Sequence, residues 1–481
     1  MSLNALSVAD LQQKLRAGEL SPLEALNSLE ARIEQVDPQI GGYLWRDIEA
    51  ARKLAATADV SLPLGGVPIA IKDAINVQGE PATSASKILK GYLSPYDATV
   101  IRRLREAGAI PFGRTNMDEF AMGSSTENSA FQKTFNPWDT SRIPGGSSGG
   151  SAAVVAADEA FAALGSDTGG SIRQPAALCG CVGFKPSYGR VSRFGLTAFA
   201  SSLDQIGPIT KTVRDTALVM NAIAGKDAHD STSLEEPVPD FTAQLGQDLR
   251  GVRLGMPREY FIAGIDPHVD AAIRAAIRHY ESLGAEIVEV SLPHTEHAVG
   301  VYYIVATAEA SANLARFDGV RYGHRGQASN LIEQYGRTRE EGFGPEVKRR
   351  IILGTYVLSS GYRDAYYLQA QKVRTLIRRD FIDAFKQVDA IICPTTAEVA
   401  FKVGERSDDP LKMYLADIFT IAANLAGICG ISLPCGFADV EGKTLPIGLQ
   451  LLGKPFHEAE LLKIAHAYEQ STAWHQARPI A

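Results

Sequence analysis

The chain has 481 residues, of which 45% are hydrophobic and 21% charged, and its formal net charge is −7. This composition is that of an ordinary globular protein, and it excludes a disordered or fibrous chain. The acidic balance and the lack of a Lys/Arg run argue against tight nucleic-acid binding by this chain itself. Five cysteines without a CxxC pair argue against both a disulfide framework and a zinc site.

Residues 1–60 are predicted to form an N-terminal helical arm. Ser7 is placed as the N-cap of a first helix, and Ser21 as the N-cap of a second. Ser21 is followed by a proline and, three residues on, by a glutamate, which is a capping-box pattern. Asp37-Pro38 is expected to end the second helix. Residues 61–481 are predicted to form a single large domain.

From about residue 60 the pattern alternates between short apolar strands and helices, with glycine-rich joints. Such alternation predicts an α/β sheet with helices packed on its faces. The stretch 226–251 is rich in Asp, Ser, Glu and Pro and is expected to be an exposed connection. An uncharged stretch at 418–438 contains glycines and a proline, so it is interpreted as a buried helix followed by a core strand and not as a membrane span. The predicted strands cover 67–71, 110–113, 161–164, 252–255, 285–290 and 390–393, and the predicted helices 98–107, 152–157, 267–282 and much of 299–385.

Two serine-glycine clusters carry the candidate chemistry, at 145–151 and at 165–171. No histidine precedes His229, so a serine nucleophile in either cluster would need another base. Ser171 is predicted to lie at a strand-to-helix turn, where unpaired backbone N–H groups face a developing negative charge. Ser147 would be placed to relay a proton. Lys72 ends an apolar strand, where partial desolvation favours the neutral amine that can act as a base.

Each of these features also has an ordinary explanation. Glycine-serine loops are more often plain turns or phosphate cradles, although neither cluster has the spacing of a P-loop. A lysine at a strand end is usually a solvated surface residue. The occurrence of Lys72 and both clusters in one α/β region favours a site over these explanations.

Together these segments resemble the amidase signature family, which hydrolyses amides with a Ser-cisSer-Lys triad. The resemblance implies the amidase signature fold, with a central mixed β-sheet covered by helices on both faces. It implies Ser171 as nucleophile, Ser147 as the bridging serine in the cis conformation, and Lys72 as base. It further implies an oxyanion hole formed by the backbone N–H groups of Thr168, Gly169, Gly170 and Ser171.

Further segments, at 116–128, 201–208 and 316–323, are similar to the glutamine-hydrolysing subunits of tRNA-dependent amidotransferases. That resemblance implies that glutamine is hydrolysed to supply ammonia for converting Glu-tRNA(Gln) to Gln-tRNA(Gln), as part of a glutamine-dependent ligase. It implies two partner subunits in a heterotrimer, ATP and Mg²⁺ used by a partner, and tRNA bound through the partner. For this chain it implies no cofactor and no metal. The first residues lack a basic segment followed by an apolar one, so no signal peptide is expected and a cytoplasmic location without a membrane is predicted.

A glutamine pocket needs a cation for the α-carboxylate and an acid for the α-ammonium. The resemblance implies Arg350 and Asp417 for these roles, with Tyr302 as a further pocket residue. Arg349 is an alternative to Arg350, Asp417 could instead be an N-cap, and Tyr302 could be a core residue. Two alternative functions remain, a stand-alone amidase acting on another small amide and an inactive scaffold; the intact triad argues against the second.

Overall fold

The structure is a computed structural model that describes residues 2–261 and 264–479. Its centre is one eleven-stranded sheet in the order β1-β3-β2-β4-β6-β5-β10-β11-β9-β7-β8. Strand β2 pairs in parallel with β3 and β4, whereas β10 pairs antiparallel with β5 and β11. The sheet is therefore mixed, as predicted. The strands are β1 (Tyr43–Trp45), β2 (Pro68–Lys72), β3 (Ile110–Thr115), β4 (Ala162–Asp167), β5 (Val182–Lys185), β6 (Gln205–Thr210), β7 (Arg253–Pro257), β8 (Glu286–Val290), β9 (Ala390–Pro394), β10 (Cys429–Val440) and β11 (Lys443–Gly453).

Helices cover both faces of this sheet, which confirms the predicted architecture. Neighbouring residues of a strand point to opposite faces. In β9, Ile392 packs into a core that includes α4, α7, α8 and α15, whereas Ile391 and Cys393 pack into a second core with α9, α12 and α14. The helices are α1 (Val8–Arg16), α2 (Pro22–Ile40), α3 (Ile48–Ala56), α4 (Thr99–Glu106), α5 (Gly149–Ala156), α6 (Arg173–Cys179), α7 (Val213–Ile223), α8 (Pro267–Ser282), α9 (Ala298–Asn313), α10 (Leu331–Gly342), α11 (Pro345–Leu358), α12 (Gln369–Ala384), α13 (Pro410–Tyr414), α14 (Ile421–Ala426) and α15 (Glu458–Gln470).

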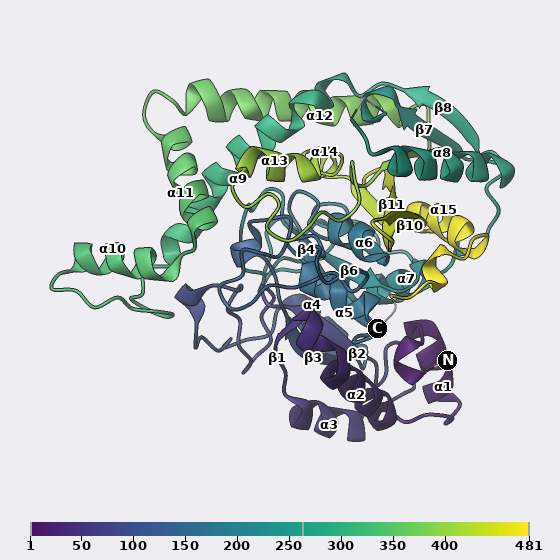
Figure 1. The fold of residues 1–481 in the computed structure, drawn as a ribbon, viewed down its shortest axis with the longest axis horizontal. Helices are drawn as coiled ribbons and strands as arrows, with labels where there is room; N and C mark the ends of the chain where they lie inside the picture. Colours follow the sequence, from purple (N-terminus) through teal and green to yellow (C-terminus); the bar gives the residue numbers. More distant parts are fainter. Residues whose placement is uncertain (1, 262–263, 480–481) are drawn as a thin grey trace.

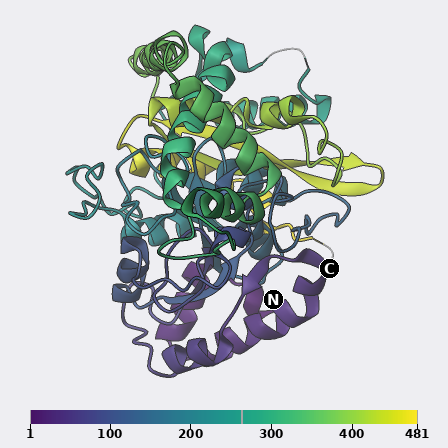
Figure 2. The same cartoon turned by 90° about the vertical axis from the view of Figure 1, so that its left-hand side faces the viewer.

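The N-terminal helices α1 to α3 lie at one end of the molecule and α12 at the other, while α10 projects from the body (Figures 1 and 2). Ser7 and Ser21 cap α1 and α2 as predicted, and Ser21 forms the full capping box. The same N-terminal segment also supplies β1, which pairs antiparallel with β3 at the sheet edge.

The prediction that Asp37-Pro38 ends the second helix is wrong, because α2 continues to Ile40. A proline within a helix removes one N–H donor and its ring clashes with the preceding turn, which usually kinks or ends the helix. Here the last turn is held by the burial of Ile40 and by Gly41, which adopts the left-handed conformation with φ 67° and donates to the Asp37 carbonyl at 2.7 Å. The Asp37 carboxylate then accepts from the Gly42 N–H at 2.6 Å.

Most of the other predicted elements are present with shifted ends. Helix α8 has the predicted bounds, and the uncharged stretch at 418–438 contains α14 followed by most of β10. The stretch 226–251 connects α7 to β7 without a helix or strand. Within the described residues, no helix combines the length and apolarity that a bilayer crossing requires.

Candidate active site

Lys72 is the last residue of β2, and its side chain is fully buried. Its Nζ lies 2.7 Å from the Ser147 Oγ and 2.8 Å from the Ser148 Oγ. Burial lowers the pKa of Lys72 from 10.5 to about 7, against the opposing charge of Asp118 and two further aspartates. The amine is therefore substantially neutral at physiological pH and able to accept a proton.

The loop that carries Ser147 is fixed by hydrogen bonds from several segments. The Gly146–Ser147 peptide bond is cis. The Gly146 N–H donates to the Gln174 side-chain carbonyl at 2.9 Å, and the Ser147 carbonyl accepts from the Asp118 N–H at 3.2 Å. These contacts hold the Ser147 hydroxyl at the Lys72 amine.

Ser171 lies in the loop between β4 and α6 and is almost fully buried. Strand β4 ends at Asp167 and helix α6 begins at Arg173, so Ser171 lies in a strand-to-helix turn, as predicted. The Ser171 carbonyl accepts from the Ser148 N–H at 3.1 Å, which joins the two serine loops directly. Among the described residues, the Ser171 hydroxyl makes no hydrogen bond to Ser147. The structure thus joins Lys72 to Ser147 and brings Ser171 to the same loop, while the final link of the relay stays a prediction.

The backbone around Ser171 is shaped for close approach by a substrate. Gly170 has φ 141°, and a Cβ there would meet the Thr420 Oγ1 at 2.2 Å. A Cβ on Gly169 would meet the Tyr302 ring at 2.8 Å. The Gly169 N–H has no hydrogen-bond partner in the part of the chain that the structure describes, as an oxyanion donor requires. Gly170 was also predicted to donate its N–H to the oxyanion. In the structure this N–H donates instead to the Asp167 carboxylate at 2.8 Å.

The remaining predicted oxyanion residue, Thr168, is anchored by its side chain. Its hydroxyl donates to the Asp204 carboxylate at 2.7 Å. Burial raises the pKa of Asp204 to about 6, although the Thr168 hydrogen bond opposes that rise. The side-chain bond fixes the residue and leaves its backbone N–H free of any hydrogen bond to the described residues.

A buried ion pair between Arg173 and Asp167 flanks the Ser171 loop, and it was not among the predicted site residues. The Arg173 Nε lies 3.1 Å from the Asp167 carboxylate, and both side chains are fully buried. Burial alone would raise the pKa of Asp167, but the charge and hydrogen bond of Arg173, with smaller contributions from Lys185 and Asn424, together lower the pKa to about 2. Arg173 also donates to Gln450 at 2.7 Å and to Asn424 at 2.6 Å. Asp167 and Arg173 are of opposite charge and six residues apart, which is compatible with a pair. Gln450 and Asn424 lie some 250 residues further along the chain, so no local pattern indicates their contacts with Arg173.

Asp417 lies beside Gly170 in the Ser171 loop, and Arg350 of α11 is close enough for its charge to act on Asp417. The Arg350 side chain is 4% exposed whereas that of Arg349 is 49% exposed, which settles which arginine faces inward. Asp417 is not the N-cap of α14, because that helix begins at Ile421 after Thr420. One Asp417 oxygen accepts from Ser124 at 2.5 Å, and the other is buried without a partner among the described residues.

Asp417 and Tyr302 both contact the glycines before Ser171. The unpartnered Asp417 oxygen lies 3.3 Å from the Cβ position of Gly170, and the Tyr302 ring lies against Gly169. Burial raises the pKa of Asp417 to about 7, opposed by the hydrogen bond from Ser124. Burial also raises the pKa of Tyr302, so its phenol stays protonated. Tyr302 is thus buried, as a core residue would be, and also touches the candidate oxyanion loop.

A model of the family described as Amidase matches residues 24–462. The chain belongs to the amidase family. It is 62% identical to the A subunit of the glutamyl-tRNA(Gln) amidotransferase of Methylacidiphilum infernorum, over 98% of this chain and 96% of that protein. It is 57% identical to the same subunit from Thermodesulfovibrio yellowstonii, over the whole of both chains.

Solved structures agree with this assignment. The crystal structure of the glutamyl-tRNA(Gln) amidotransferase A subunit from Thermotoga maritima superimposes with a TM-score of 0.83 at 42% identity, covering 98% of this chain and 96% of that chain. The peptide amidase from Stenotrophomonas maltophilia gives a TM-score of 0.81 at 32% identity, covering 98% of each chain. The chain therefore shares its fold with amidases of differing substrates.

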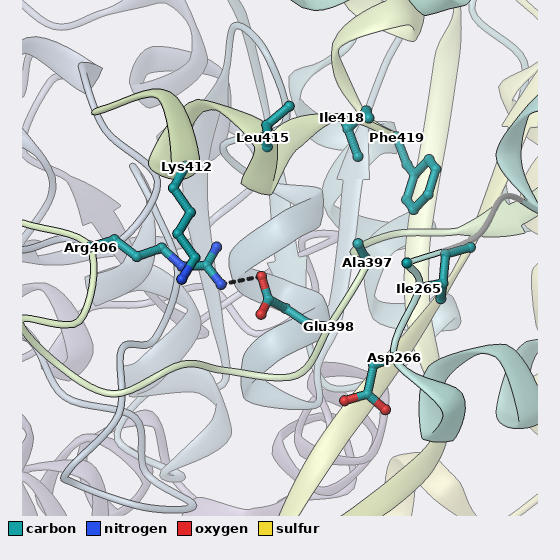
Figure 3. Close-up of a pocket in the computed structure, with 10 residues that line it drawn as sticks. Ile265, Asp266, Ala397, Glu398, Arg406, Lys412, Leu415, Ile418 and Phe419 are labelled. Carbon is teal, nitrogen blue, oxygen red and sulfur yellow. Dashed lines mark hydrogen bonds and ion pairs between the residues drawn. The ribbon is translucent and has the colours of Figure 1, made fainter. Parts of the chain in front are cut away.

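Two cavities flank the 410–419 segment of this amidase. One, of about 240 Å³, is lined by Arg350 together with Ser125, Glu346 and Tyr414. The other, of about 530 Å³, is lined by Arg406, Lys412, Leu415 and Phe419 among others, and Arg406 pairs with Glu398 at its wall (Figure 3). None of the predicted site residues lines this second cavity within the described chain, so we assign it no part in the chemistry.

Proposed function

We propose that the chain is the glutaminase subunit of a tRNA-dependent amidotransferase, hydrolysing glutamine and supplying ammonia to a partner. The observation that supports the proposal is a buried cation and a buried acid, Arg350 and Asp417, close enough for the charge of Arg350 to act on Asp417 and for both to act on Tyr302. Arg350 offers a buried cation for an α-carboxylate, and Asp417 offers an unpartnered oxygen for an α-ammonium. The Asp417 oxygen lies beside Gly170, which directly precedes Ser171.

The proposed reaction is acyl transfer through Ser171. The Ser171 Oγ attacks the side-chain carbonyl carbon of glutamine, and its proton passes through Ser147 to the neutral Lys72 amine. The oxyanion is stabilised by the N–H groups of Thr168, Gly169 and Ser171. Lys72 returns the proton to the leaving nitrogen, so that ammonia departs. Water then adds to the γ-glutamyl ester and releases glutamate and free Ser171.

The partners follow from the same proposal. Two other subunits would complete a heterotrimer, with ATP and Mg²⁺ used by a partner to activate the glutamate carried on tRNA(Gln). The net charge of −7 supports binding of tRNA through the partner and not through this chain. A stand-alone amidase is the second candidate, favoured by the fold similarity to the peptide amidase.

Ammonia release from glutamine by the assembled complex tests the proposal. We expect Ser171→Ala to abolish release, whereas Ser282→Ala, a matched change on the exposed face of α8, leaves it intact. Full activity in Ser171→Ala would reject the nucleophile. An isolated chain that hydrolyses glutamine and simple amides equally well, without stimulation by partners and charged tRNA, would favour the stand-alone amidase.

A further inference from the structure

Glu346 lies one helical turn before Arg350 on α11, and the two side chains are paired. The Arg350 Nε donates to the Glu346 Oε1 at 2.7 Å. Residues four apart on a helix face the same side, so this pair follows from the spacing. Both side chains are largely withdrawn from solvent, at 4% exposure for Arg350 and 11% for Glu346. A buried charged pair of this kind holds its geometry more firmly than a surface pair.

The pair leaves the far end of the guanidinium free. The two terminal nitrogens of Arg350 make no hydrogen bond to any residue that the structure describes. A guanidinium carries five N–H groups, and one is used at Nε, so four remain on the two terminal nitrogens. That edge can bind a carboxylate through two parallel hydrogen bonds.

Aromatic rings and a second hydrogen bond fix the same two residues. The Arg350 guanidinium lies over the rings of Tyr303 and Tyr414, at 5.2 and 5.4 Å from their centroids. These two rings stack on each other with centroids 3.9 Å apart. The Tyr414 hydroxyl donates to the same Glu346 oxygen at 2.9 Å. Glu346 therefore joins α11 to α13 at the wall of the 240 Å³ cavity.

We propose that Glu346 is a positioning residue for substrate recognition, which holds Arg350 through Nε so that its terminal nitrogens meet the α-carboxylate of glutamine. This inference rests on the proposed glutaminase function. An arginine side chain has several rotatable bonds, and ordering it before the substrate arrives removes that entropy loss from binding. Glu346 makes no contact with the reacting amide in this account, so it acts on binding and not on the chemical step.

The test measures kcat and KM of the assembled complex with two substrates. One is glutamine, and the other is 4-aminobutanamide, which has the ammonium and the amide but no α-carboxylate. Glu346→Gln replaces the carboxylate that accepts from the Arg350 Nε by a neutral amide oxygen, so we expect KM for glutamine to rise about tenfold with kcat nearly unchanged. We expect kcat/KM for 4-aminobutanamide to stay the same. Glu346→Asp keeps the negative charge on a shorter side chain and is expected to raise KM for glutamine less than Glu346→Gln does.

Two further variants keep the test decisive. Glu340→Gln changes an exposed glutamate on α10 and is expected to leave kcat and KM unchanged for both substrates. Tyr414→Phe removes the second donor to Glu346 and is expected to raise KM for glutamine alone, by about threefold; it also provides the readout if Glu346→Gln does not fold. An unchanged or lowered KM, or an equal loss with both substrates, overturns the inference. A wild-type complex without glutaminase activity would instead reject the proposed function.

Discussion

The buried amine of Lys72 predicts a specific pH dependence of acylation. Its pKa falls from 10.5 to about 7 because the side chain is removed from water. That fall corresponds to about 5 kcal/mol of destabilisation of the ammonium form. At pH 7 about half of the amine is then neutral, compared with roughly 0.03% for a lysine in water. Burial therefore raises the concentration of the base form by a factor of about 1,500.

The assay is kcat/KM for ammonia release from glutamine between pH 5.5 and 9. Only the neutral amine accepts the Ser171 proton, so kcat/KM is expected to rise with pH, with a midpoint near 7 and a plateau above about 8. Asp417, whose pKa is also about 7, titrates in the same direction, because its ionised form binds the ammonium. Asp417→Asn removes that second titration and is expected to lower kcat/KM while keeping the midpoint.

Two results would refute this reasoning. A rate that is flat across the range means that no group near pH 7 controls acylation. A kcat/KM for Asp417→Asn that still rises tenfold per pH unit at pH 9, with no plateau, means that Lys72 titrates as if it were in water. Lys72→Ala must also remove the pH-dependent acylation while the protein still melts cooperatively.

Two further predictions concern stability. Arg173→Met leaves Asp167 buried without its partner, so urea unfolding at pH 7 is expected to show a loss of about 3–5 kcal/mol. The folded pKa of Asp167 lies below its unfolded value, so this stabilisation is present above about pH 4 and is lost as the pH falls toward 2. The free energies of unfolding of wild type and variant should therefore converge near pH 2. A difference that stays constant with pH contradicts the pairing. Gly354→Ala places a Cβ 1.9 Å from the Thr307 carbonyl of α9 and is expected to destabilise by about 1–3 kcal/mol. Gly336→Ala on α10 meets nothing within 4 Å and is expected to stabilise by up to about 1 kcal/mol, and equal effects of the two changes would refute the packing argument.

The sequence was sufficient for features set by local pattern. The capping box at Ser21 and the bounds of α8 depend on residues within a few positions of each other, and both are confirmed. The end of α2 was not predictable, because the tertiary burial of Ile40 outweighs the effect of one proline.

In the candidate site too, some features could be predicted from residue types and others depended on tertiary structure. The residue types at Lys72 and Ser147 suggested a lysine base, and the structure places the two side chains in contact. To choose between Arg349 and Arg350, one must know which face of α11 is buried. A run of three basic residues does not indicate that face. The Ser124 contact with Asp417 spans 293 residues, so no local pattern indicates it.

The long-range contacts of Arg173 have a consequence for synthesis of the chain. Arg173 shapes the Ser171 loop through Asp167, and it is itself held by Asn424 and Gln450. These two partners leave the ribosome long after Ser171 does. A nascent or truncated polypeptide therefore contains the nucleophile without the residues that fix its loop. We therefore expect a chain that ends before β11 to lack amide hydrolysis even though it contains Ser171.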